Sequence, residues 1–323
     1  MACPIANIIS DAMMDTRGVR NAWLMAMFAV SLAGACSCRP QAGPNWSSAA
    51  AHAARLAPQA RIVVLDIATG RVLAGSHLAK AARTLAAPGS TLKPLVLYGL
   101  IASGRWDPSR RIACSRKLRI AGRSLNCAHP PADPPGAPFD ARQALAWSCN
   151  TYFAGVAATL APGELRRLLA PTGLLGETGL APAEAIAEFR DPRSTEEASL
   201  TLLGVDGIRV TPLELASAYR WLALQLAAHS GSAAAQVVQA GLADSASFGI
   251  AASASLGGVP VAGKTGTANL GPGTPSHGWF AGLAPAGQPS VVVAVYLPAG
   301  RGANAAQVAA DLLAHSPLRQ GRQ

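Results

Sequence analysis

Hydrophobic positions along the chain fall into short β-branched runs near both ends and helical stripes between them. Residues 61–67 (RIVVLDI) precede turn chemistry at 68–71 and a second apolar run at 72–75, so this region predicts a strand hairpin. Strand-like runs return at residues 258–268, 278–283 and 290–297.

Between these runs the apolar spacing is helical. The pattern predicts helices that begin at Ser90, lead into Ser148, and lie near residues 163–169, 211–227 and 304–314. A Pro- and Asp-rich stretch, 129–140, predicts a loop. This order predicts an α+β fold: an antiparallel β-sheet flanked by helices, with a large helical insertion.

The N-terminal segment predicts export. Hydrophobic residues make up 50% of the 323-residue chain, yet no apolar run reaches the roughly 20 residues that a membrane span needs. The longest run, residues 22–35, follows Arg17 and Arg20 and ends in small residues, which is typical of a secretory signal. Cys36 directly follows, so lipoprotein processing with a lipid anchor at Cys36 is the alternative. Either route leads to the periplasm or the extracytoplasmic face of the inner membrane, and membrane contact is expected only through this segment.

The remaining boundaries follow from composition. We predict a signal over residues 1–35, an Ala/Pro-rich tether over 36–59, one domain over 60–316 and a tail over 317–323. Because an exported chain meets oxidising conditions, Cys114 and Cys127, which bracket a hairpin-like stretch, are predicted to form a disulfide. Cys149 is predicted to be a buried, reduced thiol. We predict neither a cofactor nor a metal site.

The net charge of +10 is concentrated in residues 105–123, which hold seven Lys and Arg residues. This basic segment is either a solvated hairpin face or a contact for anionic envelope polymers. Nucleic acid is not an expected partner, because the chain has an export signal and the segment lacks interleaved aromatic residues.

Three short strings carry the candidate chemistry: residues 90–93 (STLK), 148–150 (SCN) and 264–267 (KTGT). Together they supply a nucleophilic hydroxyl, two amines and a second hydroxyl, as acyl transfer by a serine enzyme requires. Of the 27 Lys and Arg residues only four are lysine, and two of these lie in the strings. A desolvated lysine can lose its proton and act as a base, whereas arginine cannot.

The position of each residue suggests its role. Ser90 at a helix start gains a positive local field, and Lys93, one turn later, can accept its proton. Ser148 can relay a proton to a leaving amine, and Asn150 can bind a substrate's peptide backbone. Lys264, Thr265 and Thr267 suit a terminal carboxylate on a strand where Gly266 is expected to let a ligand approach closely.

These strings, with residues 210–216 (VTPLELA) and 279–282 (WFAG), resemble the transpeptidase domain of penicillin-binding proteins over residues 60–316. The resemblance implies a serine D,D-transpeptidase that cross-links peptidoglycan stem peptides ending in D-Ala-D-Ala and is acylated by penicillin and other β-lactams. It further implies that the backbone N–H groups of Ser90 and Thr267 form an oxyanion hole. The short segment before residue 60 leads us to expect that glycan polymerisation comes from a separate glycosyltransferase.

Other functions stay open at this point. A D,D-carboxypeptidase would use water in place of the acceptor amine, and the strings do not separate the two. A serine β-lactamase is disfavoured because no asparagine has a glutamate four residues before it and no Tyr-x-Asn occurs. A non-catalytic β-lactam sensor or envelope module is a further alternative. Residues 124–126 (SLN) also fit Ser-x-Asn, and we prefer Ser148 because it lies at a helix start.

Overall fold

The computed structural model describes residues 45–131, 134, 136–269 and 274–322. The predicted signal, residues 1–35, and the candidate lipid site at Cys36 lie outside the described residues. Within the described part, no helix has the length and hydrophobicity needed to cross a membrane.

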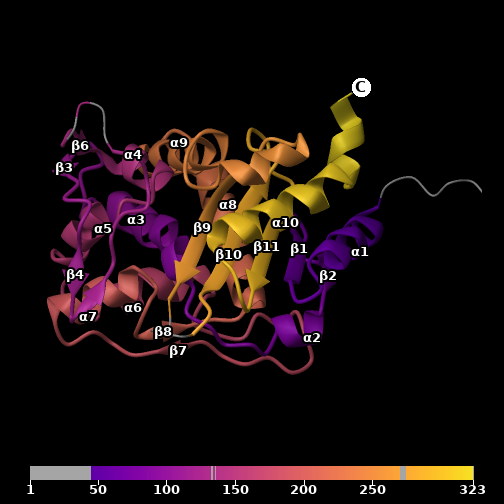
Figure 1. Cartoon of the computed structure of the whole chain (residues 1–323), viewed down its shortest axis with the longest axis horizontal. Coiled ribbons are helices and arrows are strands. Elements are labelled where there is room, and N and C mark those ends of the chain that lie inside the picture. Colours follow the sequence, from indigo (N-terminus) through magenta and orange to yellow (C-terminus); the bar gives the residue numbers. More distant parts are fainter. Residues whose placement is uncertain (1–44, 132–133, 135, 270–273, 323) are drawn as a thin grey trace, which may run out of the picture. The chain divides into compact units, whose positions relative to one another are not determined.

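A five-stranded antiparallel sheet forms the centre of the fold (Figure 1). Its strands, in spatial order, are β2 (Val72–Ser76), β1 (Arg61–Asp66), β11 (Val291–Leu297), β10 (His277–Ala284) and β9 (Ala262–Ala268). Strands from the two ends of the chain therefore meet at the β1–β11 pair, where Val63 lies opposite Ala294. All seven residues of β11 are buried, as expected for a central strand covered on both faces.

One face of the sheet packs against α1 (Trp46–Leu56), η3 (Ala252–Gly257) and α10 (Gly302–Ala314). Figure 1 shows α10 lying across the strands on this face. The structure differs here from the tether predicted over residues 36–59, because α1 begins after the cap Asn45 and buries Ala49, Ala50 and Ala53. The alanines that suggested a flexible linker are small side chains that let α1 pack closely on α10.

The other face packs against α8 (Pro212–Ala228), whose neighbours are α3 (Lys93–Ala102) and α9 (Ala233–Ser247). The start of α8 follows from its sequence, since Thr211 and Glu214 form a reciprocal capping box around Pro212. The helix also fixes the residue directly after Ser90: Tyr219 Oη donates a hydrogen bond to the carbonyl of Thr91 at 3.0 Å.

The chain between β2 and β9 is the predicted helical insertion, which ends with α8 and α9. It contains α2 (Leu78–Ala81), η1 (Gly89–Leu92), α3, α4 (Ala141–Ala146), α5 (Asn150–Ala157), α6 (Glu164–Leu169), η2 (Ala170–Thr172) and α7 (Thr195–Leu202). Three two-stranded ladders join its loops: β3 (Ile112–Ala113) with β6 (Pro138–Phe139), β4 (Arg119–Ile120) with β5 (Arg123–Ser124), and β7 (Glu188–Phe189) with β8 (Ile208–Arg209). A last short helix, η4, covers Pro317–Arg322. The predicted α+β class, an antiparallel sheet flanked by helices, is confirmed.

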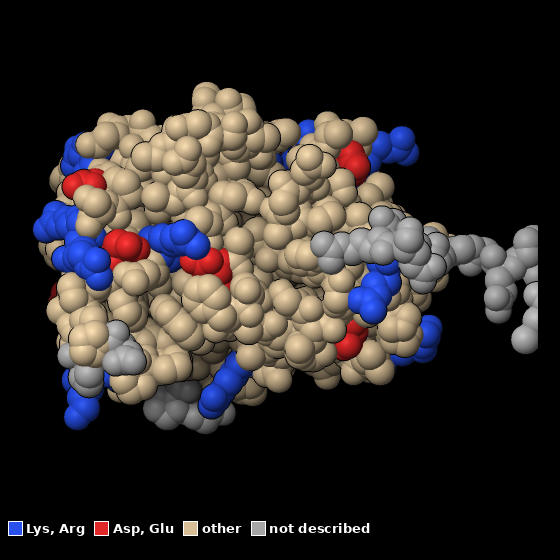
Figure 2. Space-filling view, turned by 90° about the horizontal axis from the view of Figure 1, so that it is seen from above, with Lys and Arg blue, Asp and Glu red and all other residues tan. Residues whose placement is uncertain are grey.

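Within the basic segment, residues 105–123, several side chains have partners in the same chain. Arg105 pairs with Glu164 at 3.3 Å, Arg110 lies 4.8 Å over the ring of Trp106, and Arg123 pairs with Asp206 at 3.4 Å. On the face drawn in Figure 2, basic side chains likewise lie beside acidic ones at several places. These contacts support the interpretation of the segment as a solvated face that is partly neutralised by its own carboxylates.

Candidate active site

Ser90 lies in η1, at the junction with α3, where strand β9 runs alongside. Gly89 makes this close approach feasible: it has a φ of +59°, and a Cβ added there would lie 2.7 Å from the backbone N of Thr267. The indole of Trp279 on β10 donates to the carbonyl of Ala87 at 2.8 Å and fixes the segment from below. The sheet therefore places the backbone of Ser90 beside that of Thr267, the two groups expected to form an oxyanion hole.

Lys93 lies one helical turn after Ser90 and is fully buried. Its Nζ donates to Asn150 Oδ1 at 2.7 Å, to the carbonyl of Ser148 at 2.9 Å and to Ser148 Oγ at 3.2 Å. Two of the three predicted strings, residues 90–93 and 148–150, thus meet through a single amine.

The environment of Lys93 favours its neutral form. Burial lowers the pKa of Lys93 to about 7, since desolvation penalises the ammonium; Cys149 and Cys127 oppose the shift. A lysine with such a pKa has a large neutral fraction near neutral pH and can accept a proton.

Ser148 lies in the turn between α4 and α5, and its neighbour Cys149 caps α5. Ser148 has a φ of +55°, which is uncommon for a residue with a side chain. This left-handed conformation places both its carbonyl and its hydroxyl within reach of Lys93. The sequence predicted Ser148 at a helix start, and the structure places it two residues before the first residue of α5.

Strand β9 at the sheet edge carries the third string. Lys264 is fully buried, and burial together with the nearby Lys93 lowers the pKa of Lys264 well below its usual value. Thr267 Oγ1 accepts a hydrogen bond from the backbone N–H of Gly302 at 2.9 Å, which leaves its own proton free to be donated.

Gly266 has a different role from the one predicted. A Cβ added at this position would meet the carbonyl oxygen of Pro88 at 2.3 Å. The missing side chain thus lets β9 approach the segment before Ser90, so the close neighbour of Gly266 is the protein's own chain.

A cavity of about 920 Å³ lies where these elements meet, lined by Ser90, Ser148, Asn150, Thr265 and Thr267 among others. Lys93 and Lys264 do not line it and lie behind its wall. The cavity also has lining residues that the sequence did not assign to the site: Asn126, Trp147, Val205, Ile250 and Arg301. Arg301 precedes α10 and adds a cation near Thr267, and no motif in the sequence marks it.

Ser124, the alternative serine of residues 124–126, lines the same cavity from β5. It makes no hydrogen bond to Lys93, whereas Ser148 does. Asn126 uses its Oδ1 to accept a hydrogen bond from the backbone N–H of Leu118 at 2.9 Å, which stabilises the β4–β5 hairpin. These contacts favour the choice of Ser148 over Ser124.

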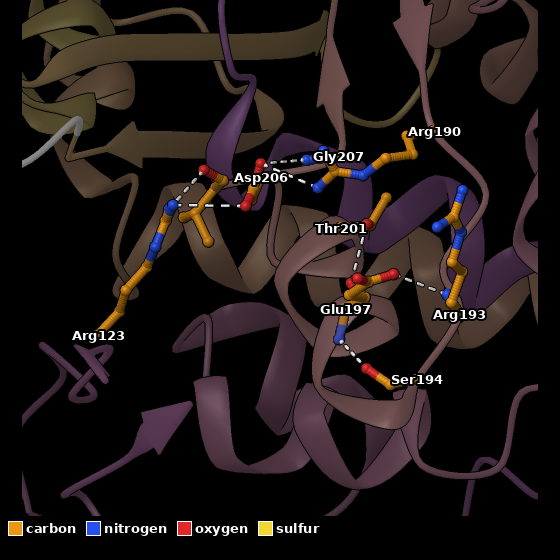
Figure 3. Close-up of polar contacts among 9 residues, drawn as sticks. Arg123, Arg190, Arg193, Ser194, Glu197, Thr201, Asp206 and Gly207 are labelled. Atoms are coloured by element: carbon orange, nitrogen blue, oxygen red, sulfur yellow. Dashed lines mark hydrogen bonds and ion pairs between the residues drawn. The ribbon is translucent and has the colours of Figure 1, made fainter. Parts of the chain in front are cut away.

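The β4–β5 hairpin forms one wall of the cavity and is attached to the loop before β8 by ion pairs. Arg123 donates to Asp206 Oδ2 and to the carbonyl of Val205, while Arg190 reaches Asp206 from the other side (Figure 3). Below this group, Ser194 caps α7 by accepting from the backbone N–H of Glu197 (Figure 3). The ion pairs of this wall are exposed, while Leu118, Ile120 and Leu125 attach the hairpin to the hydrophobic core.

The predicted disulfide between Cys114 and Cys127 is absent from the structure, and both thiols are free. Their sulfurs lie 3.4 Å apart, because the hairpin turns both side chains toward a shared group that includes His129 and Thr151. Cys149 is free and fully buried, as predicted.

Comparison with known proteins assigns this arrangement to a family. The sequence profile of the penicillin binding protein transpeptidase domain matches residues 60–314. The chain belongs to this family. Membership of this family supports a role in peptidoglycan synthesis and implies an enzyme of the serine acyltransferase kind.

Solved structures of transpeptidase domains share the fold. The apo transpeptidase domain of Burkholderia pseudomallei penicillin-binding protein 3 superposes with a TM-score of 0.69 at 21% identity, covering 86% of this chain and 96% of that one. Pseudomonas aeruginosa PBP2, solved in complex with WCK 5153, gives a TM-score of 0.68 at 22% identity and covers 85% and 76%. A search of curated protein sequences gives no match.

Proposed function

We propose that this transpeptidase is a serine D,D-transpeptidase, which acts on stem peptides ending in D-Ala-D-Ala through an acyl-enzyme on Ser90. The observation that carries the proposal is the buried Lys93 amine, which hydrogen-bonds Ser148 and Asn150 next to Ser90 at the edge of one cavity. The site thus combines a nucleophile that lines the cavity, Ser90, with a base of suitable pKa, Lys93, which contacts a proton relay, Ser148.

In the acylation step, Ser90 Oγ attacks the carbonyl carbon of the penultimate D-Ala, and its proton passes to neutral Lys93. The tetrahedral intermediate then collapses, and the bond to the terminal D-Ala nitrogen breaks. Lys93 returns the proton through the Ser148 hydroxyl, 3.2 Å away, to the departing amine. The acyl-enzyme is an ester of Ser90. The amine of a second stem peptide attacks this ester and restores the serine.

Two further groups stabilise charge in this scheme. The backbone N–H groups of Ser90 and Thr267 are proposed to bind the oxyanion, a type of contact for which each donor supplies roughly 3–4 kcal/mol in other enzymes. The terminal carboxylate is proposed to bind Thr265 and Thr267, with the cation of Arg301 nearby and Lys264 buried behind the cavity wall. The free hydroxyl proton of Thr267 supports this assignment.

Penicillin follows the same first step, since Ser90 attacks the β-lactam carbonyl and opens the ring. The ring nitrogen stays attached to the acyl group, so no leaving group departs and the ester persists. A D,D-carboxypeptidase, in which water attacks the acyl-enzyme, is the alternative for the second step. A β-lactamase would need a base positioned for that water, and no Glu or Asp lines the cavity among the described residues.

For the cellular setting, we propose that the chain is exported and acts at the outer face of the inner membrane. A separate glycosyltransferase would then supply the glycan strands that it cross-links.

Labelling with fluorescent penicillin tests the nucleophile. The wild type is expected to gain one covalent label that peptide mass spectrometry locates at Ser90, and Ser90→Ala is expected to gain none. Folding of the variant is checked by circular dichroism and thermal melting. A label of equal yield on folded Ser90→Ala would refute the assignment.

A second experiment separates the two acyl acceptors. Donor pentapeptide is supplied with and without an amine acceptor, and both D-Ala release and cross-linked product are measured. A transpeptidase yields cross-linked product when the acceptor is present, whereas release of D-Ala without that product would identify a carboxypeptidase.

A further inference from the structure

Four potential metal ligands converge beside the active site. Cys114 lies just after β3, Cys127 and His129 follow the β4–β5 hairpin, and Cys149 lies between Ser148 and Asn150. Their three sulfurs and the imidazole nitrogen all lie within 4.8 Å of one another. Segments distant in sequence thus bring a Cys₃His set to one point.

The distances fit one tetrahedral ion. Zinc binds thiolate sulfur at about 2.3 Å and imidazole nitrogen at about 2.0–2.1 Å, so ligand atoms of a tetrahedral site are separated by about 3.8 Å for two sulfurs and about 3.5 Å for sulfur and nitrogen. Here Cys127 Sγ lies 3.8 Å from Cys149 Sγ and 3.4 Å from Cys114 Sγ. Cys114 Sγ lies 3.4 Å from His129 Nε2.

The surrounding hydrogen bonds orient the same atoms. His129 Nδ1 lies 2.6 Å from the carbonyl of Pro130, and a proton on Nδ1 leaves Nε2 free to bind a metal. The backbone N–H of Asn150 donates to Cys127 Sγ at 3.2 Å, and that of Arg116 donates to Cys114 Sγ at 3.4 Å. Such donors stabilise thiolates, the form that binds metal.

Burial also favours a closed site. His129 is 1% exposed and Cys149 is fully buried. Three thiolates and one imidazole suit zinc, and with four protein ligands no position remains for water or substrate, as in structural zinc sites.

We propose that Cys114, Cys127, His129 and Cys149 bind one Zn²⁺ ion, which fixes the 148–150 turn to the β4–β5 hairpin. The ion would join the turn at Ser148, the end of the β4–β5 hairpin and the segment after β3 by coordination bonds rather than by surface ion pairs. Because Cys149 separates Ser148 from Asn150, its coordination would also fix the two partners of Lys93. This last consequence rests on the proposed function, whereas zinc binding does not.

Zinc and a disulfide between Cys114 and Cys127 exclude each other, since the disulfide removes two thiolate ligands. The structure favours zinc, because Cys127 lies close to a third thiol and Cys114 lies close to an imidazole. A two-sulfur crosslink would leave the inward orientation of Cys149 and His129 unexplained.

The test begins with metal content. The full chain is purified under non-oxidising conditions with zinc supplied, and zinc, iron and copper are measured by inductively coupled plasma mass spectrometry. We expect about one zinc per chain and, after replacement by Co²⁺, the absorption bands of a tetrahedral thiolate complex. Cys114→Ser and His129→Ala are expected to lose the ion, and His129→Cys to retain it. His229→Ala, at the exposed end of α8, is the matched control and should bind zinc like the wild type.

A second measurement covers variants that fail to fold. A chelator that removes zinc from the wild type should make the thiols of Cys114, Cys127 and Cys149 reactive, three for each zinc released. It should also slow penicillin acylation about tenfold, which re-added Zn²⁺ reverses. A folded, reduced protein without zinc, a Cys114–Cys127 disulfide formed in the presence of zinc, or iron or copper in its place would each overturn the proposal. Failure on metal content would leave labelling of Ser90 intact, so the two hypotheses fail separately.

Discussion

The floor and the wall of the cavity are held in different ways. The floor, formed by η1, α3 and β9, buries Lys93 and Lys264 completely and belongs to the core packed around the five-stranded sheet. The wall, formed by the β4–β5 hairpin and the turn at Ser148, has strands of only two residues each. A few apolar side chains such as Ile120, the exposed arginines and the thiol group attach it. The base that reacts thus lies in the buried core, and the partners that orient it come from a region that needs its own attachments.

Removing the amine from the floor should have the largest effect among the following substitutions. Lys93→Met keeps a long apolar side chain in a buried position, so we expect a folded protein. Penicillin acylation is expected to fall by about 10²–10⁴-fold, the usual contribution of a general base. Stopped-flow or gel-based labelling rates measure the effect.

The matched control is Lys80→Met, on the exposed helix α2. It should acylate at the wild-type rate. If folded Lys93→Met reacts within about threefold of the wild type, the proton of Ser90 goes to another group.

Two serines of the wall provide a sharper comparison. Ser148→Ala removes the hydroxyl that contacts Lys93 and should slow acylation by about 10²-fold. Ser124→Ala changes the same residue type on the same cavity but removes no contact to Lys93, so we expect a change of less than about twofold. The reverse order of the two effects would assign the relay to Ser124.

The pH dependence tests whether the floor controls the protonation state. The pKa of Lys93 is about 7, lowered by burial, so the amine is neutral above this pH and protonated below it. Since acylation needs the neutral amine, its rate should fall about tenfold per pH unit below 7 and level off above it.

Lys264 also has a lowered pKa and lies near Lys93, so the assignment needs a control. In Lys93→Met the inflexion near pH 7 should disappear from the residual rate. An unchanged inflexion would assign the titration to a different group.

The floor was largely predictable from the sequence and the wall was not. Strands β1, β9, β10 and β11 carry β-branched or motif residues, and α3 and α8 have clear apolar spacing or caps, so local pattern and tertiary packing agree. The sequence does not predict the long helix α9, because its alanine-rich sequence has no strong apolar stripe. Packing against α4 and β9 stabilises this helix in the fold. Helix α1 differs from the predicted tether because its buried face consists of alanines, a composition that is also typical of a linker.

The three strings predict a shared site, but they do not predict which of its side chains touch. Spacing predicts Lys93 near Ser90, whereas the bonds from Lys93 to Ser148 and Asn150 depend on the left-handed turn at Ser148, which no glycine marks. The sequence predicts a disulfide between Cys114 and Cys127 because the two residues bracket one hairpin-like stretch. Cys149 and His129 lie near these thiols only in the folded chain, where the N–H of Asn150 donates to Cys127 Sγ, a tertiary effect that spacing does not reveal.

The smallest expected effect comes from the ion pair at the wall. Arg123→Ala removes the contacts to Val205 and Asp206, but both charged side chains are substantially exposed, at 46% and 38%. Water screens such pairs, so the free energy of unfolding should fall by less than about 1 kcal/mol in denaturant titrations. Arg193→Ala is the matched control, since Arg193 contributes its backbone N–H to Glu197 (Figure 3) and should change stability even less.

The effect of Arg123→Ala on reactivity depends on what else holds the hairpin. With zinc bound to Cys127 and His129, the hairpin stays attached when Arg123 is removed, and acylation should change by less than about threefold. When zinc is first removed by a chelator, Arg123→Ala should slow acylation more than it does in the zinc-bound protein. In that state the ion pair of Arg123 with Asp206 has no zinc site to compensate for its loss. Equal effects of Arg123→Ala in both states would mean that the ion pair and the thiol group act on separate parts of the wall.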